Sequence, residues 1–146
     1  MRLALPTALV AAFAAFGCAP TPEKLTEDVN FNSQAVYDHT CEICPSILGS
    51  ATTEECWAAN ANRNYLPVYS PCIADAYALD EQGSLATMQC FSDAFWEMHE
   101  CVETTLVCND GGASYAACDT AHQAALASCE PFPTAVFDAM TACAGL

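Results

Sequence analysis

Basic residues are nearly absent from this 146-residue chain. Arg2, Lys24 and Arg63 are its only Lys and Arg residues, against 18 Asp and Glu, and the formal net charge is −15. Affinity for nucleic acid comes mostly from cationic side chains that neutralise phosphates, and anionic lipid headgroups attract the same kind of cluster. The composition therefore argues against nucleic acid as a partner and against a membrane surface bound by charge alone.

The uncharged, apolar segment at the start of the chain is too short to span a membrane. Residues 3–16 form an uncharged stretch of 14 residues, whereas a spanning helix needs about 20 apolar residues. A positive start at Met1-Arg2 followed by an apolar segment of this length is typical of a secretory signal peptide. We therefore expect residues 1–17 to be a signal peptide and the rest of the chain to be exported.

The apolar stretch leads into Ala15-Phe16-Gly17-Cys18, where a Cys follows a small residue. This motif resembles the lipobox of bacterial lipoproteins, and the resemblance covers the first 18 residues. It implies that Cys18 carries lipid, becomes the first mature residue and anchors the protein to a membrane. Ala19 implies, by the same resemblance, an outer-membrane location in the bacterial cell envelope. The alternative is an ordinary signal peptide without lipidation, which gives a secreted protein.

Cysteine is unusually abundant, with 11 residues in the chain. A short exported chain rich in Cys is typical of a disulfide scaffold. An odd number leaves one Cys unpaired, whereas lipidation of Cys18 leaves ten, which can form five bridges. The parity therefore favours lipidation.

The segment 18–32 is polar, contains two prolines and shows no apolar periodicity. These features predict a tether between the lipid anchor and the folded part of the chain. The remaining residues, 33–146, are enough for one compact domain.

That domain has few of the β-branched residues that strands favour. From residue 33 onward it contains 21 Ala but only 8 Val and Ile together, and Ala is the best helix former. The sequence therefore predicts an all-α fold, a small disulfide-rich bundle of about five to six short helices. Capping residues, prolines and glycines, with Gly83 as one stop, place the helices at about 33–44, 53–62, 71–82, 85–108, 114–130 and 133–143.

The helix expected at 85–108 carries two stripes and is therefore expected to be central. One stripe holds cysteines, and the other holds apolar residues spaced by three or four. The apolar stripe is Met88, Phe91, Phe95, Met98, Val102 and Leu106.

A disulfide-stapled antiparallel hairpin follows from matched cysteine spacings. Cys90 and Cys101 are 11 residues apart, as are Cys118 and Cys129 on the next expected helix. A short Gly-rich turn makes the two helices antiparallel. Residues that face each other then have numbers with a constant sum, which predicts the bridges Cys90–Cys129 and Cys101–Cys118.

The other six cysteines allow 15 pairings. In the hairpin register Cys108 falls opposite Gly111, so it must reach another element, for which Cys143 in the last helix is one candidate. The six residues are Cys41, Cys44, Cys56, Cys72, Cys108 and Cys143.

Cys41 and Cys44 form a Cys-x-x-Cys motif. A redox-active pair of this kind sits at a helix N-terminus, where the helix dipole stabilises thiolate, but here Pro45 follows at the end of an expected helix. We favour two structural cysteines bridged to different elements, with a thiol–disulfide redox protein as the alternative. Together with His39 and His99, the two cysteines have the residue types of a zinc site. Thiols in an oxidising compartment favour disulfides, so we do not expect zinc here.

Carboxylates supply the remaining candidates for metal binding. The hairpin register sets Glu97 opposite His122, and Asp119 lies one turn before His122, a partial match to a carboxylate-and-histidine metal site. We favour a hydrogen-bonded Glu97–His122 pair with no metal. The acidic row on the long helix is interpreted as a solvated face, with a divalent cation as the alternative; it consists of Asp93, Glu97, Glu100 and Glu103.

No nucleophile-elbow motif or phosphate-binding glycine loop is present in the sequence. We therefore expect no catalytic activity and no cofactor. The expected role is structural or partner-binding, for an exported, lipid-anchored domain whose protein partner is not identified by any motif. The alternatives are a carrier of a small apolar ligand and a cation-binding protein.

Overall fold

The computed structural model describes residues 20–144. This part of the chain is helical and contains no strand, so the all-α prediction is confirmed. Its helices, including two short 3-10 turns, are α1 (Pro22–Ile43), η1 (Pro45–Leu48), α2 (Thr53–Asn60), α3 (Pro71–Ala78), α4 (Glu81–Thr105), η2 (Cys108–Asp110), α5 (Ala113–Ser128) and α6 (Thr134–Ala144).

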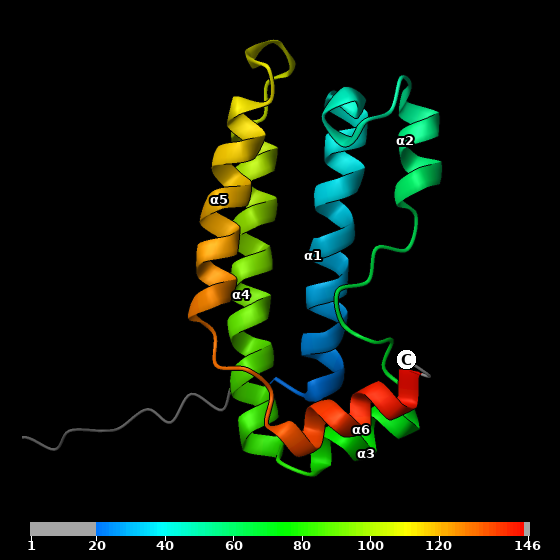
Figure 1. The fold of residues 1–146 in the computed structure, drawn as a ribbon, viewed down its shortest axis with the longest axis vertical. Coiled ribbons are helices and arrows are strands. Elements are labelled where there is room, and N and C mark those ends of the chain that lie inside the picture. Colours follow the sequence, from blue (N-terminus) through cyan, green and yellow to red (C-terminus); the bar gives the residue numbers. More distant parts are fainter. Residues whose placement is uncertain (1–19, 145–146) are drawn as a thin grey trace, which may run out of the picture.

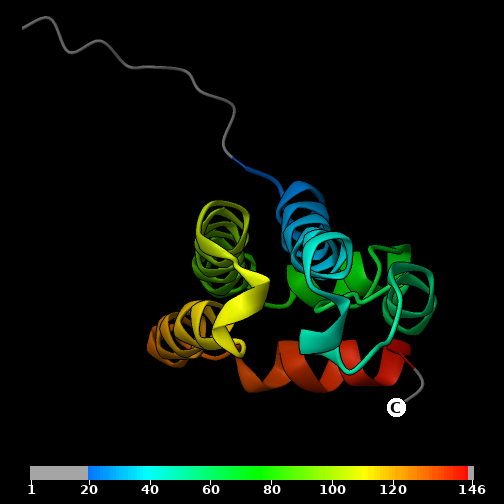
Figure 2. The ribbon, with the colours of Figure 1, turned by 90° about the horizontal axis from the view of Figure 1, so that it is seen from above.

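The helices lie along two different directions. Helices α1, α4 and α5 run along the long axis, and α3 and α6 lie together across one end (Figure 1). The view along that axis shows α1 and α5 as separate neighbours of α4, with α2 beside α1 (Figure 2). Helix α4 is therefore central, as its two stripes predicted.

The core has two parts, and α4 contributes to both. The larger part gathers Val29, Tyr77, Met88 and Val136 where the crossing pair α3 and α6 meets α1 and α4. The smaller part lies farther along α1, α4 and α5 and includes Val36, Met98, Val102 and Cys118. Every residue of the predicted apolar stripe on α4 is buried or half-buried.

The hairpin of α4 and α5 contains both predicted bridges. The Cα atoms are 5.7 Å apart in Cys90–Cys129 and 5.8 Å apart in Cys101–Cys118, within the range that a disulfide requires. The two cross-links lie near opposite ends of the α4–α5 contact, so neither helix can slide along the other.

The other three bridges join elements that are distant in sequence. Cys44 at the end of α1 bonds to Cys108, 64 residues away, and Cys72 of α3 bonds to Cys143 of α6, 71 residues away. The candidate pair Cys108–Cys143 is therefore wrong, because α4 carries Cys108 toward the end of α1 while α6 packs on α3. With Cys41–Cys56, all ten cysteines of residues 20–144 are bonded.

The predicted tether is wrong for residues 22–32, which form the first half of α1. The Thr21 hydroxyl accepts a hydrogen bond from the Lys24 amide (3.2 Å), and a proline in the first turn suits a helix start because its missing N–H is not needed there. Leu25 and Val29, one turn apart, are buried in the core. Two apolar residues among polar ones gave too weak a pattern to identify this buried stripe from sequence.

Gly83 does not end α3 as predicted but lies in the first turn of α4. Asp80 caps this helix, since its carboxylate accepts a hydrogen bond from the Gly83 amide (2.9 Å). A Cβ atom at residue 83 would lie 2.8 Å from Cγ of Pro133 and 2.9 Å from Oδ2 of Asp80. The glycine therefore allows the start of α6 to approach the cap of α4.

Gly83→Ala is expected to destabilise the protein by about 1 kcal/mol or more. This net loss includes the higher helix propensity of alanine, which by itself would stabilise α4. The added methyl group must displace the Pro133 ring or the Asp80 carboxylate. Urea unfolding curves measure the change, with Gln82→Ala at an exposed site of the same turn as the control. A Gly83→Ala protein as stable as the wild type would contradict this account of the close approach.

Candidate functional site

A polar cavity lies between α1 and α5, which both pack on α4. Its volume is about 240 Å³, and Tyr65, from the segment between α2 and α3, lines it together with side chains of the three helices. The full lining is Ser33, Val36, Tyr37, Tyr65, Phe95, Met98, Tyr115, Asp119, His122, Gln123 and Leu126.

His122 is a buried member of this lining, but its partner is not the predicted one. Its Nδ1 atom lies 3.1 Å from the carbonyl oxygen of Ala94, and its ring packs edge-on against Phe95 with centroids 4.5 Å apart. Glu97 is exposed and is not among the partners of His122. The predicted Glu97–His122 pair is therefore wrong, because the small Ala94 side chain leaves its own carbonyl within reach of the imidazole.

Tyr115 and Asp119 bring ionisable groups to the same cavity. Burial raises the pKa of the Tyr115 hydroxyl to about 12, with the neighbouring Tyr37 and Asp119 adding to the shift. Asp119 accepts a hydrogen bond from Gln123 (3.4 Å). Within residues 20–144, no three His, Cys, Asp or Glu side chains gather as a metal-binding group, and the weak candidates Glu97, Asp119 and His122 are not brought together.

A second, apolar cavity of about 390 Å³ lies beside the crossing pair of helices. None of the charged side chains of residues 20–144 lines it. Its lining comes from the segment before α3, from α4, from the linker before α6 and from α6 itself: Tyr65, Leu66, Pro67, Phe91, Pro131, Phe132, Phe137, Met140 and Thr141.

Tyr65 lines both cavities. Its ring lies 5.5 Å from the ring of Phe91, in the apolar cavity, and 4.6 Å from that of Phe95, in the polar cavity. The next residue, Leu66, is clamped by Asn30 of α1, whose amide group accepts from the Leu66 N–H (2.8 Å) and donates to its carbonyl (3.0 Å). An irregular segment thus gains a fixed position through one side chain.

Large aromatic side chains are exposed on the other side of α1. Phe31 is 67% exposed, Trp96 of α4 57% and Trp57 of α2 45%. Phe31 lines a hollow with Trp57 and another with Trp96, so the three rings share one surface. We call this surface the aromatic face; its rings are accompanied by the carboxylates of Asp28, Asp38, Glu42 and Asp93.

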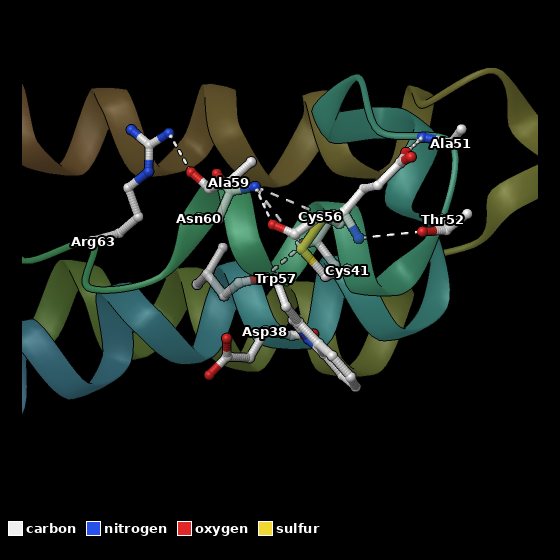
Figure 3. Close-up of a disulfide and its surroundings, with 12 residues drawn as sticks. Asp38, Cys41, Ala51, Thr52, Cys56, Trp57, Ala59, Asn60 and Arg63 are labelled. Atoms are coloured by element: carbon white, nitrogen blue, oxygen red, sulfur yellow. Dashed lines mark hydrogen bonds between the residues drawn. A yellow bond between two sulfur atoms is a disulfide. The ribbon is translucent and has the colours of Figure 1, made fainter.

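Helix α2 is fixed to α1 in a way that sets the position of Trp57. The Cys41–Cys56 bridge joins the two helices, and the indole N–H of Trp57 donates to the Asp38 carbonyl (3.4 Å) (Figure 3). Thr52 caps the start of α2, since its hydroxyl accepts from the Glu55 amide (3.2 Å). The indole ring is therefore held on a short but well-anchored helix.

The Cys-x-x-Cys motif is structural, as favoured from the sequence. Cys41 bonds to Cys56 and Cys44 to Cys108, and both motif cysteines are buried. The two sulfur atoms therefore do not form the shared disulfide that a redox pair requires, and they are not available to join His39 and His99 in a zinc site. The acidic row on α4 lies on an exposed surface, which matches the solvated face predicted for it.

Several residues that shape these surfaces gave no sequence signal. The contacts of Asn30 with Leu66 join positions 36 residues apart, and Tyr65 lies in a segment without helical periodicity. Neither residue belongs to a motif. Exposure of Phe31, Trp57 and Trp96 was also missed, because large aromatic residues are most often core residues.

Tyr115→Phe is expected to reduce the loss of stability at high pH. The folded-state pKa of about 12 exceeds the unfolded value of about 10, so the stabilising contribution is intact below pH 10 and is lost as the pH rises toward 12. Urea unfolding midpoints at about pH 9 and about pH 11 measure the difference. Equal losses in the wild type and the variant would contradict the assigned burial.

No family model, curated protein or solved structure matches this chain. In the part of the chain that the structure describes, no helix is long and apolar enough to cross a membrane.

Proposed function

We propose that this protein is an exported, lipid-anchored binding domain without catalytic activity, which holds a basic and partly apolar segment of a partner protein on its aromatic face. One observation carries the proposal: three large aromatic side chains are exposed together among carboxylates. Exposed apolar surface rimmed by polar groups marks interaction sites in soluble proteins.

Export and anchoring are supported by the sequence and are compatible with the disulfides. Five bridges among residues 20–144 suit an oxidising compartment. Cys18 lies outside the described residues, so its lipidation rests on the lipobox resemblance. Only residues 19–21 separate Cys18 from the first turn of α1, so a lipid there would hold the domain close to the membrane surface.

The aromatic face has the properties of a binding hot spot. Trp supplies a large contact area and is enriched among the residues that dominate binding energy. Trp57 is held by a disulfide-linked helix, and both Phe31 and Trp96 lie within long helices. Since their backbone positions are already fixed, little conformational entropy is lost when a partner covers them.

The charge of the domain favours a partner rich in Lys and Arg. Residues 20–144 contain one salt bridge, Lys24–Asp28 at 2.6 Å, so Asp38, Glu42 and Asp93 on the aromatic face carry no paired cation. A cationic segment would find attractive potential during approach, and its guanidinium or ammonium groups can lie over the Trp rings. An acidic partner would be repelled by the same groups.

Trp96→Ala is expected to weaken binding of a short amphipathic Leu/Lys peptide at least about tenfold, because the indole supplies exposed contact area at a fixed position. Isothermal titration calorimetry measures the affinity. The matched control is Leu79→Ala, which removes an exposed apolar side chain (59%) outside the aromatic face and should bind the peptide as the wild type does.

Two peptides of the same pattern test the chemistry of the partner. One has Glu in place of Lys, and the other has Ser in place of Leu; both should bind much more weakly than the Leu/Lys peptide. The proposal is overturned if Trp96→Ala and the wild type bind equally, or if the Glu peptide binds as well as the Lys peptide.

Cys18→Ser is expected to abolish incorporation of a labelled fatty acid in a bacterial host, and to move the protein from the detergent-rich to the aqueous phase on detergent partitioning. Cys108→Ser is the control, since it removes the bridge to Cys44 but leaves the lipobox intact. A wild-type protein that takes up no label, or a Cys18→Ser protein that is still labelled, would show that the anchor is absent or lies elsewhere.

A further inference from the structure

The apolar cavity has the size of a small-molecule site. Its volume of about 390 Å³ falls in the range of about 300–1,000 Å³ typical of ligand pockets. Its walls are aromatic rings, prolines and aliphatic side chains. The hydroxyl group of Thr141 is already used, because it donates to the carbonyl of Phe137 on the same helix (2.9 Å).

The lining of this cavity carries no charged side chain, although the domain as a whole is strongly acidic. Residues 20–144 contain 18 carboxylates and two basic side chains, and none of them lines the cavity. A charged ligand would lose its hydration there without gaining a partner, and an anion would also be repelled by the surrounding acidic surface. The cavity therefore selects for an uncharged ligand.

Two disulfides and one pair of hydrogen bonds fix the positions of the segments that line the cavity. The Cys90–Cys129 bridge lies next to Phe91 and shortly before the linker residues Pro131 and Phe132. The Cys72–Cys143 bridge holds α6 against α3, and Asn30 clamps Leu66 on the remaining wall. Unconstrained walls would relax into such a space, whereas cross-linked walls preserve it and lower the entropic cost of binding.

The geometry of the rings indicates a flat ligand. Phe91 lies edge-to-face with Tyr65 and with Phe132, with centroid distances of 5.5 and 5.8 Å, and all three rings line the cavity. A planar aromatic molecule can add further contacts of these kinds. Tyr65 lines both cavities, and in the apolar cavity it is the only lining residue besides Thr141 that has a hydroxyl group.

We propose that the apolar cavity is a binding site for a small, uncharged, planar aromatic molecule with at most one polar group, directed toward Tyr65. This site is separate from the aromatic face, with which it shares no lining residue. The proposal of a small-ligand site is therefore independent of the proposal that a basic partner binds the aromatic face.

Indole is a suitable probe, because it is flat, uncharged and soluble and carries one N–H group. We expect indole to cause a saturable shift of the Met140 methyl signal in ¹³C-methyl-methionine NMR spectra of the full chain purified from an oxidising compartment. Met140 lines the apolar cavity, whereas Met98 lines the polar cavity and Met88 is buried in the core; both should shift much less. Indole-3-acetate, the charged analogue, should leave Met140 unchanged.

Phe137→Glu places a carboxylate at the rim of the cavity, at a side chain that is 57% exposed and so tolerates the change without unfolding. It should weaken indole binding at least about tenfold. Leu79→Glu adds the same charge at a similarly exposed site outside the lining and should bind indole as the wild type does. The proposal is overturned if Met140 does not shift saturably, if Met98 shifts in its place, or if Phe137→Glu binds indole as tightly as the wild type.

Discussion

The covalent attachment of α5 to α4 at two levels is the constraint on which the rest of the structure depends. Cys90–Cys129 and Cys101–Cys118 fix the register of the hairpin, and α1 then packs on the free side of α4. The end of α4 carries Cys108 to the end of α1, while its beginning meets the crossing pair α3 and α6 through the close approach at Gly83. A shift of α5 along α4 would strain the segments at its two ends, which carry Cys108 and Pro133.

Cross-links also explain how a small domain can keep features that packing alone would remove. Bridges that close loops of 64 and 71 residues each stabilise the folded state by about 2–4 kcal/mol, mainly by restricting the unfolded chain. With that contribution the protein can retain an apolar cavity and three exposed aromatic rings. In a domain held only by its core, the same features would cost a large share of its net stability.

The two faces of α1 give the molecule two different chemistries. Ser33, Val36 and Tyr37 face the polar cavity, whereas Phe31, Asp38 and Glu42 lie about half a helical turn away, on the aromatic face. One helix thus borders both the polar cavity and the acidic, aromatic surface. The apolar cavity proposed for a small ligand has no lining residue from α1 and is separate from the aromatic face.

Local spacing determined what could be predicted from the sequence alone. Ala-rich composition and capping residues predicted the helices, and equal spacings on two neighbouring helices fixed two bridges, because a helix repeats every 3.6 residues and a short turn makes its neighbour antiparallel. Only the tertiary structure decided the partner of Cys108, the contact of His122 with Ala94, the role of Gly83, the clamp of Asn30 on Leu66 and the two cavities. Each of these depends on which distant segments meet and on how closely they approach, and neither is encoded in a periodic pattern along the chain.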